Sequence, residues 1–103
     1  AIITPRWMRH ILTHTTGELR EQVVERIEKF GKHVFGVEGC EASIQAIHDF
    51  YREIGIPMTL KEVGIDDSRL GEMAKHVAEL EGLDEAWVPL YEQDILDIFK
   101  ACL

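Results

Sequence analysis

The sequence has few of the features that mark secreted, disulfide-bonded or membrane proteins. Its 103 residues include two cysteines, Cys40 and Cys102, which are far apart in the chain and form no CxxC pair. We therefore expect reduced thiols and no disulfide. No apolar run approaches the roughly 18 residues of a membrane span, and Pro5 interrupts the apolar start too early for a secretory signal. These absences predict a cytoplasmic protein with no membrane partner.

Basic residues are also scarce. Asp and Glu number 19 against 11 Lys and Arg, the formal net charge is −8, and no Lys or Arg lies between His76 and Lys100. Because binding to phosphates needs a basic face, nucleic acid is not an expected partner. A chain of this length buries one modest core, so we expect a single helical domain over residues 1–103.

Apolar residues recur at helical spacing, and no stretch alternates apolar and polar residues as a half-buried strand would. The pattern predicts an all-α protein, a bundle of about five to six helices. The expected helices cover residues 1–13 with a break or kink near Pro5, 18–34, 41–54, a segment that starts after 66–68, and 92–101. Thr59 and Glu62 have capping-box spacing, but Gly64 follows so closely that only one turn is expected.

The apolar stripes of these helices predict the core. The predicted core residues are Trp7, Met8, Leu19, Val23, Ile27, Phe30, Val34, Ile44, Ile47, Tyr51, Ile54, Leu70, Met73, Val77, Leu80, Ile95, Ile98, Phe99 and Cys102. A loop from residue 81 to 90 contains Trp87, a large aromatic residue that either plugs the core or lines a cleft.

The five histidines suggest a metal site, and only His10 and His14 have ligand spacing, since residues i and i+4 share a helix face. The segment contains no HExxH glutamate and no further ligand close by. Two surface histidines near a helix C-terminus are therefore the favoured interpretation. We read His33, His48 and His76 as solvated or locally paired side chains.

Other reactive groups are present without partners. Cys40 begins an expected helix, a position that can lower a thiol pKa, but no base accompanies it to make a nucleophile. Acid pairs such as Asp66 with Asp67 fall in helix first turns, where the helix dipole explains them. The sequence contains no nucleophile elbow, phosphate-binding glycine loop or dinucleotide fingerprint.

Several stretches resemble the C-terminal region of iron-containing alcohol dehydrogenases of the butanol dehydrogenase type. Pro5-Arg6-Trp7-Met8-Arg9-His10 resembles the family's Pro-x-Trp-Met-x-Tyr helix, and Val34-Phe35-Gly36-Val37 resembles the close of its next helix. Residues 50–60, FYREIGIPMTL, are the most specific match, to Phe-Phe-x-x-Leu-Gly-Leu-Pro-Thr-x-Leu. Val88-Pro89-Leu90-Tyr91-Glu92-Gln93-Asp94-Ile95 resembles the last helix start, with Tyr91 in place of the capping Thr, which predicts a weaker cap.

The resemblance covers the chain in the family's order. It implies the end of a dehydroquinate synthase-like helical domain from an enzyme that interconverts a primary alcohol and aldehyde with NAD(P)(H) and iron or zinc. In this family the nucleotide site and the metal ligands, one Asp and three His, lie upstream of the position of Ala1. The resemblance therefore implies no catalytic, cofactor-binding or metal residue here. Trp87 and Val88, in a loop that approaches the substrate cleft in the family, become the cleft candidates.

The start of the chain fits this interpretation. It opens on Ala1-Ile2-Ile3-Thr4-Pro5, with no initiator Met or capping residue, which we read as a cut; removal of an initiator Met is the alternative. The expected partners are then the rest of the same polypeptide, the alcohol or aldehyde, and possible homodimers, with the face of Ile2, Ile3 and Trp7 left without neighbours. A free-standing acidic interaction module and a small metal protein that uses His10 and His14 are the competing hypotheses.

Overall fold

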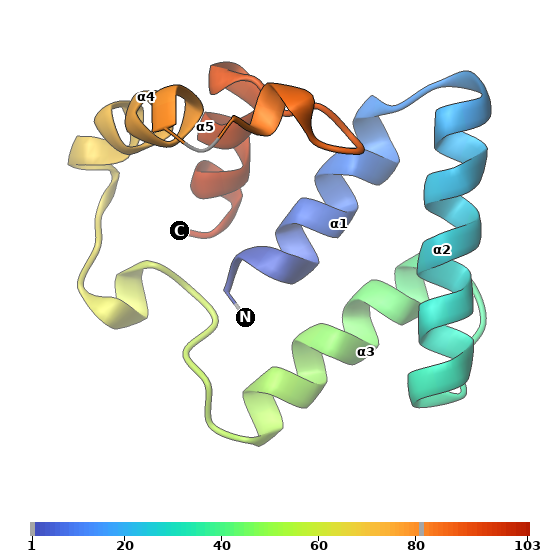
Figure 1. The fold of residues 1–103 in the computed structure, drawn as a ribbon. Coiled ribbons are helices and arrows are strands. Elements are labelled where there is room, and N and C mark those ends of the chain that lie inside the picture. Colours follow the sequence, from blue (N-terminus) through green and yellow to red (C-terminus); the bar gives the residue numbers. More distant parts are fainter. Residues whose placement is uncertain (1, 81) are drawn as a thin grey trace. The chain divides into compact units, whose positions relative to one another are not determined.

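A computed structural model describes residues 2–80 and 82–103 of the chain (Figure 1). The described residues form helices and connections without any strand, so the predicted all-α class is confirmed. The elements are α1 (Ile3–His14), α2 (Gly17–Phe35), α3 (Cys40–Glu53), α4 (Leu70–Leu80) and α5 (Glu92–Ala101), with single 3-10 turns η1 (Lys61–Val63), η2 (Asp67–Arg69) and η3 (Leu83–Glu85). The chain divides into two compact units, unit 1 (Ala1–Met58) and unit 2 (Thr59–Leu103). The single domain expected over residues 1–103 stays a prediction.

In unit 1, α1 is a continuous helix, and the predicted break near Pro5 is wrong. The helix begins at Ile3, so Pro5 lies in its first turn. The amides of the first turn have no partner within a helix, and proline therefore costs no hydrogen bond there. At the other end, the Thr15 amide and hydroxyl both donate to the Ile11 carbonyl, at 3.2 and 2.6 Å, and close the helix.

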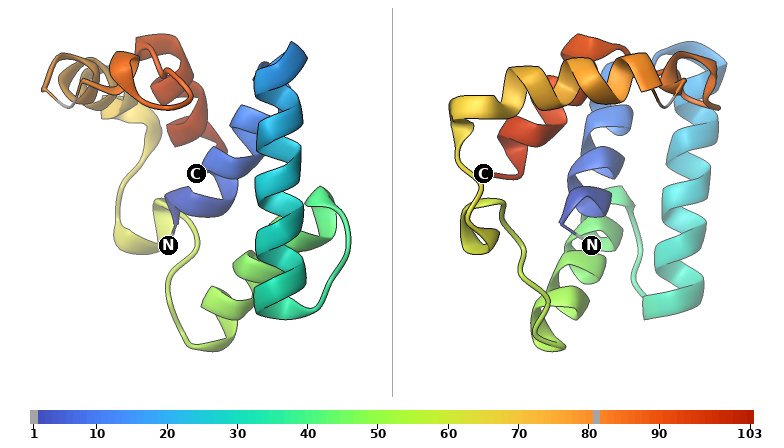
Figure 2. Two further views of the ribbon diagram at one scale, coloured as in Figure 1. Left: turned by 45° about the vertical axis from the view of Figure 1, so that its right-hand side comes forward. Right: turned by 60° about the vertical axis from the view of Figure 1, so that its left-hand side comes forward.

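Helix α3 runs in the same general direction as α2, as Figure 2 shows. The start of α3 contacts an earlier part of α2 than its end does. The Cys40 thiol donates to the Val24 carbonyl at 3.6 Å, and the Phe50 and Phe35 rings lie 5.9 Å apart. The short segment of residues 36–39 therefore returns along α2 before α3 starts. It begins at Gly36, which has a left-handed φ of 67° that favours glycine and ends α2.

The two helices touch most closely where Gly31 faces Ser43. Both residues are buried, and a Cβ atom placed on Gly31 would lie only 2.5 Å from the Ser43 Cβ. The Ser43 hydroxyl donates to the Gly39 carbonyl at 2.7 Å, which satisfies this polar group. Around this contact, the core of unit 1 contains Ile11, Leu12, Val23, Ile27, Ile44 and Ile47.

Unit 1 ends in a Schellman motif, in which a left-handed residue after a helix directs two amides back to its last carbonyls. Gly55 has a φ of 85°, its amide donates to Arg52 at 3.1 Å, and the Ile56 amide donates to Tyr51 at 3.0 Å. Pro57 follows and cannot continue the helix. The Gly-Ile-Pro sequence therefore ends α3 one residue earlier than expected.

Unit 2 starts with the single turn that the capping-box spacing predicted. The Glu62 amide donates to the Thr59 hydroxyl at 3.2 Å, and Gly64 ends η1 with a φ of 83°. The Leu60 amide donates to the Cys102 carbonyl at 2.7 Å, which ties the start of the unit to its end. Around this link, the buried residues are Leu60, Leu70, Ala74, Val88, Leu90, Ile95, Ile98, Phe99 and Cys102.

Helix α5 has the predicted bounds, and its core face of Ile95, Ile98, Phe99 and Cys102 is buried as expected. We predicted a weak cap because Tyr91 replaces threonine. The structure supplies half of a capping box instead, since the Tyr91 amide donates to the Asp94 carboxylate at 3.0 Å. The helix start therefore has a polar partner as well as apolar packing.

Three predicted core residues are exposed. Val34 is 59% exposed, Ile54 57% and Leu80 66%, each at or just after the last turn of a helix. Ile3 is 44% exposed, whereas Ile2 and Trp7 are half-buried, so the expected uncovered face at the chain start is only partly open. The apolar stripes thus extend beyond the part that each unit covers.

Candidate functional site

The loop that carries the two cleft candidates is closed by hydrogen bonds of its own. The Leu83 carbonyl accepts the amides of Ala86 at 3.2 Å and Leu90 at 2.9 Å. Val88 is 7% exposed and anchors the loop in unit 2, whereas Trp87 is 41% exposed. Trp87 is therefore not the core plug of the first alternative. Its place in a substrate cleft stays a prediction, as does that of Val88.

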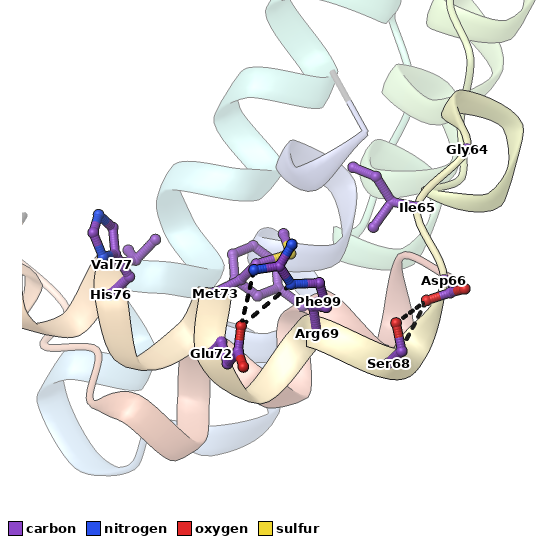
Figure 3. Close-up of a pocket in the computed structure, with 10 residues that line it drawn as sticks. All are labelled: Gly64, Ile65, Asp66, Ser68, Arg69, Glu72, Met73, His76, Val77 and Phe99. Carbon is purple, nitrogen blue, oxygen red and sulfur yellow. Dashed lines mark hydrogen bonds and ion pairs between the residues drawn. The ribbon is translucent and has the colours of Figure 1, made fainter.

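Unit 2 contains a pocket of about 520 Å³ between α4 and its neighbours (Figure 3). Its lining residues are Gly64, Ile65, Asp66, Ser68, Arg69, Glu72, Met73, His76, Val77 and Phe99. Neither Trp87 nor Val88 lines it, so the sequence prediction did not find this hollow. The available signal was the spacing of Met73 and Val77, which we assigned to the core and which are only half-buried.

Two pairs of polar residues in the lining of this pocket bind each other. The Arg69 guanidinium donates twice to Glu72 Oε2, at 3.2 Å each, and the Ser68 amide and hydroxyl both donate to Asp66 Oδ1. The two hydrogen bonds from Ser68 lower the pKa of Asp66 below its ordinary value of 3.8. An ionised carboxylate that caps η2 is not a proton donor near neutral pH. The pocket is thus an apolar hollow whose rim carboxylates, Asp66 and Glu72, are already hydrogen-bonded.

The histidine pair is brought together but does not converge on one point, and the reading of both as surface histidines is wrong for His10, which is 8% exposed. The His10 and His14 rings stack at 4.0 Å between centroids with 18° between their planes, and His14 Nδ1 lies 2.9 Å from the His10 carbonyl oxygen. The nitrogen lone pairs of each ring lie in its plane, so stacked rings hold them in two nearly parallel planes, whereas chelation of one ion needs them to converge. His48 Nδ1 lies 3.6 Å from Asp49 Oδ1 and makes no hydrogen bond.

Over the described ranges, no three His, Cys, Asp or Glu side chains gather closely enough to hold a metal ion. These residues therefore do not fit an iron site. Cys40 does not supply a nucleophile either. Burial raises the pKa of its thiol above the ordinary 9.0, and the nearby Glu28 carboxylate raises it further. The helix start that could have activated the thiol is outweighed.

Comparison with known proteins identifies the family of this helical chain. The sequence pattern described as "Fe-containing alcohol dehydrogenase family, C-terminal" matches residues 1–103. The chain belongs to this family. It is similar to NADH-dependent butanol dehydrogenase A of Clostridium acetobutylicum, with 32% identity over 97% of this chain and 26% of that protein. It is also similar to the probable NADH-dependent butanol dehydrogenase 1 of Bacillus subtilis, with 30% identity over 100% of this chain and 26% of that protein.

This member of the iron-containing alcohol dehydrogenase family spans about a quarter of the length of the curated relatives it matches. No solved structure gives a significant match to it. Within the part of the chain that the structure describes, no helix is both long and apolar enough to cross a membrane. The resemblance stated from the sequence motifs is confirmed at the level of the family and of its C-terminal region.

Proposed function

We propose that this chain is the C-terminal helical part of a longer, iron-dependent dehydrogenase that interconverts a primary alcohol and an aldehyde with NAD(P)(H). This proposal rests on the family match over residues 1–103, with butanol dehydrogenases among the relatives. The longer enzyme supplies hydride transfer with its nicotinamide and polarises the substrate oxygen with its metal. We place this enzyme in the cytoplasm, and a homodimer stays a prediction.

These 103 residues act as scaffold in this proposal. The absence of a three-ligand cluster among the described residues supports ligands that lie elsewhere in the longer polypeptide. The hydrogen-bonded rim of the pocket and the raised thiol pKa of Cys40 leave no activated acid, base or nucleophile in these places. The chain alone is therefore expected to bind neither the metal nor the nucleotide and to be inactive.

Activity measurements separate the scaffold role from independent catalysis. The purified 103-residue chain, given Fe²⁺ and NADH or NADPH, is expected to show no butyraldehyde reduction at 340 nm. The full-length product of its gene is expected to show turnover. Turnover by the 103-residue chain would refute the scaffold proposal. A gene that encodes only this segment would favour the acidic interaction module instead.

Within the longer enzyme, we propose that Trp87 forms part of the substrate cleft wall and that Val88 holds it in place. The exposed indole beside a buried anchor supports this arrangement, because the loop presents the ring while its backbone is closed by the Leu83 carbonyl. Trp87→Ala in the full-length enzyme should raise KM for longer alcohols more than it lowers kcat. Tyr91→Ala, which removes another exposed ring of unit 2, is the matched control. Equal effects of the two variants would show that Trp87 does not line the cleft.

A metal protein based on His10 and His14 is the remaining alternative, and the stacked rings weigh against it. Elemental analysis of the 103-residue chain, purified without a histidine tag, tests it directly. Stoichiometric iron or zinc that is lost in His14→Ala would establish that alternative. We expect neither metal at stoichiometric level.

A further inference from the structure

An apolar surface lies at the C-terminal ends of α2 and α3 in unit 1. We call it the α2–α3 patch, made of Phe30, Val34, Phe35, Phe50 and Ile54. Val34, Ile54 and Phe50 are 59%, 57% and 44% exposed. The other two are half-buried. No residue of the patch carries a charge or a side-chain hydrogen-bonding group.

The patch is continuous across both helices. The rings of Phe30 and Phe35 lie 5.8 Å apart in an edge-on arrangement, and those of Phe35 and Phe50 lie 5.9 Å apart. Val34 and Ile54 extend it, because each is four residues after a phenylalanine on the same helix face. A joined surface of three rings and two aliphatic side chains differs from the single exposed apolar residues that are normal on a protein.

The helices themselves point to a missing partner for this surface. Val34 continues the α2 stripe whose earlier members Val23 and Ile27 are buried, and Ile54 does the same for Ile44 on α3. On each helix the apolar residues continue at the same spacing beyond the last one that unit 1 buries. The sequence is therefore patterned for burial over a greater length than unit 1 itself provides.

We propose that the α2–α3 patch is covered by residues of the same polypeptide that precede residue 1. The inference rests on the proposed function, in which this chain is part of a longer enzyme. The matched relatives are about four times as long as the matched segment, and the family model describes its C-terminal part, so the proposed longer enzyme has a large upstream region. That region joins unit 1 through α1, which contacts both α2 and α3. Covalent attachment gives it a high effective concentration at unit 1 that a second copy lacks.

Photo-crosslinking in the full-length enzyme identifies the residues that cover the patch. p-Benzoylphenylalanine is placed at Phe50, and separately at Ile54, whose exposed position at the helix end tolerates replacement. Glu25 is the control, because it is exposed and lies on the side of α2 opposite Val34. Equal amounts of ¹⁵N-labelled and unlabelled subunits are mixed and reassembled before irradiation, and the linked peptides are identified by mass spectrometry.

We expect both patch positions to link to upstream residues within one polypeptide, with a yield well above that at Glu25. Links between labelled and unlabelled chains would assign the patch to a second copy and overturn the proposal. Links to residues 59–103, or the same low yield as at Glu25, would overturn it too. Butyraldehyde reduction by the unmodified enzyme is measured in parallel. Activity without upstream links refutes only the docking proposal, whereas upstream links in an inactive enzyme refute only the function.

Discussion

Replacement of Gly31 by alanine is expected to destabilise unit 1, although alanine is the better helix former. The new methyl group would lie 2.5 Å from the Ser43 Cβ and 3.1 Å from its Cα, and would overlap the hydroxyl. Rotation of the Ser43 side chain moves only the hydroxyl, at the loss of its hydrogen bond to Gly39. The contact between the two Cβ atoms remains, so the helix backbones must separate.

The net effect follows from two opposing contributions. Alanine in a helix gains about 1 kcal/mol over glycine. Overpacking of a buried contact costs about 1 to 3 kcal/mol, and an obstacle close to the backbone belongs at the upper end. The free energy of unfolding should therefore fall by about 2 kcal/mol. Gly71→Ala is the matched control, since nothing lies within 4 Å of its Cβ position in α4. It should be stabilising by about 1 kcal/mol.

Native-state hydrogen exchange measures both changes, because it reports the opening of each unit separately. Amides of α2 and α3 should lose protection in Gly31→Ala, and those of α4 should gain it in Gly71→Ala. Adding Ser43→Gly to Gly31→Ala removes the 2.5 Å contact and should restore part of the loss. Equal stabilisation by both alanine variants would show that α2 and α3 do not approach as described.

Asp94→Ala should cost about 1 kcal/mol and increase amide exchange in the first turn of α5, because the Tyr91 amide loses its acceptor; unchanged exchange would exclude the half capping box. Asp66 has a lowered pKa, so its stabilising contribution is present above its ordinary pKa of 3.8 and is lost as the pH falls through the lower folded pKa. An NMR titration should show this, and Ser68→Ala should raise the pKa. The Cys40 thiol, whose pKa is raised by burial, should react with iodoacetamide at pH 7.5 more slowly than a model thiol; a faster reaction would restore it as a candidate nucleophile.

The sequence predicted the bounds of the helices better than it predicted which of their apolar residues are buried. The bounds of α5 and the single turn after Thr59 were predicted because periodicity and caps are local signals. Val34, Ile54 and Leu80 fit the same periodicity and are exposed. The spacing of residues shows which face of a helix is apolar, but not how far along the helix a partner extends.

The candidate site, too, was only partly predictable from the sequence. The motifs of residues 50–60 were sufficient to indicate the family, which the comparisons confirm. They could not reveal the pocket beside α4, because its lining joins residues 64–77 with Phe99. Nor could they show that Trp87 is exposed while Val88 is buried, since both are apolar neighbours in one loop. Such differences depend on packing between elements distant in sequence.

The shared direction of α2 and α3 has an electrostatic consequence. Each helix carries about half a negative charge at its C-terminal end, and helices that run the same way place these ends near each other instead of beside a positive end. Lys32 in the last turn of α2 and Arg52 in that of α3 bring positive groups to this end. The pairing of the two helices should therefore depend on these cations, and neutral replacements should weaken it most at low ionic strength.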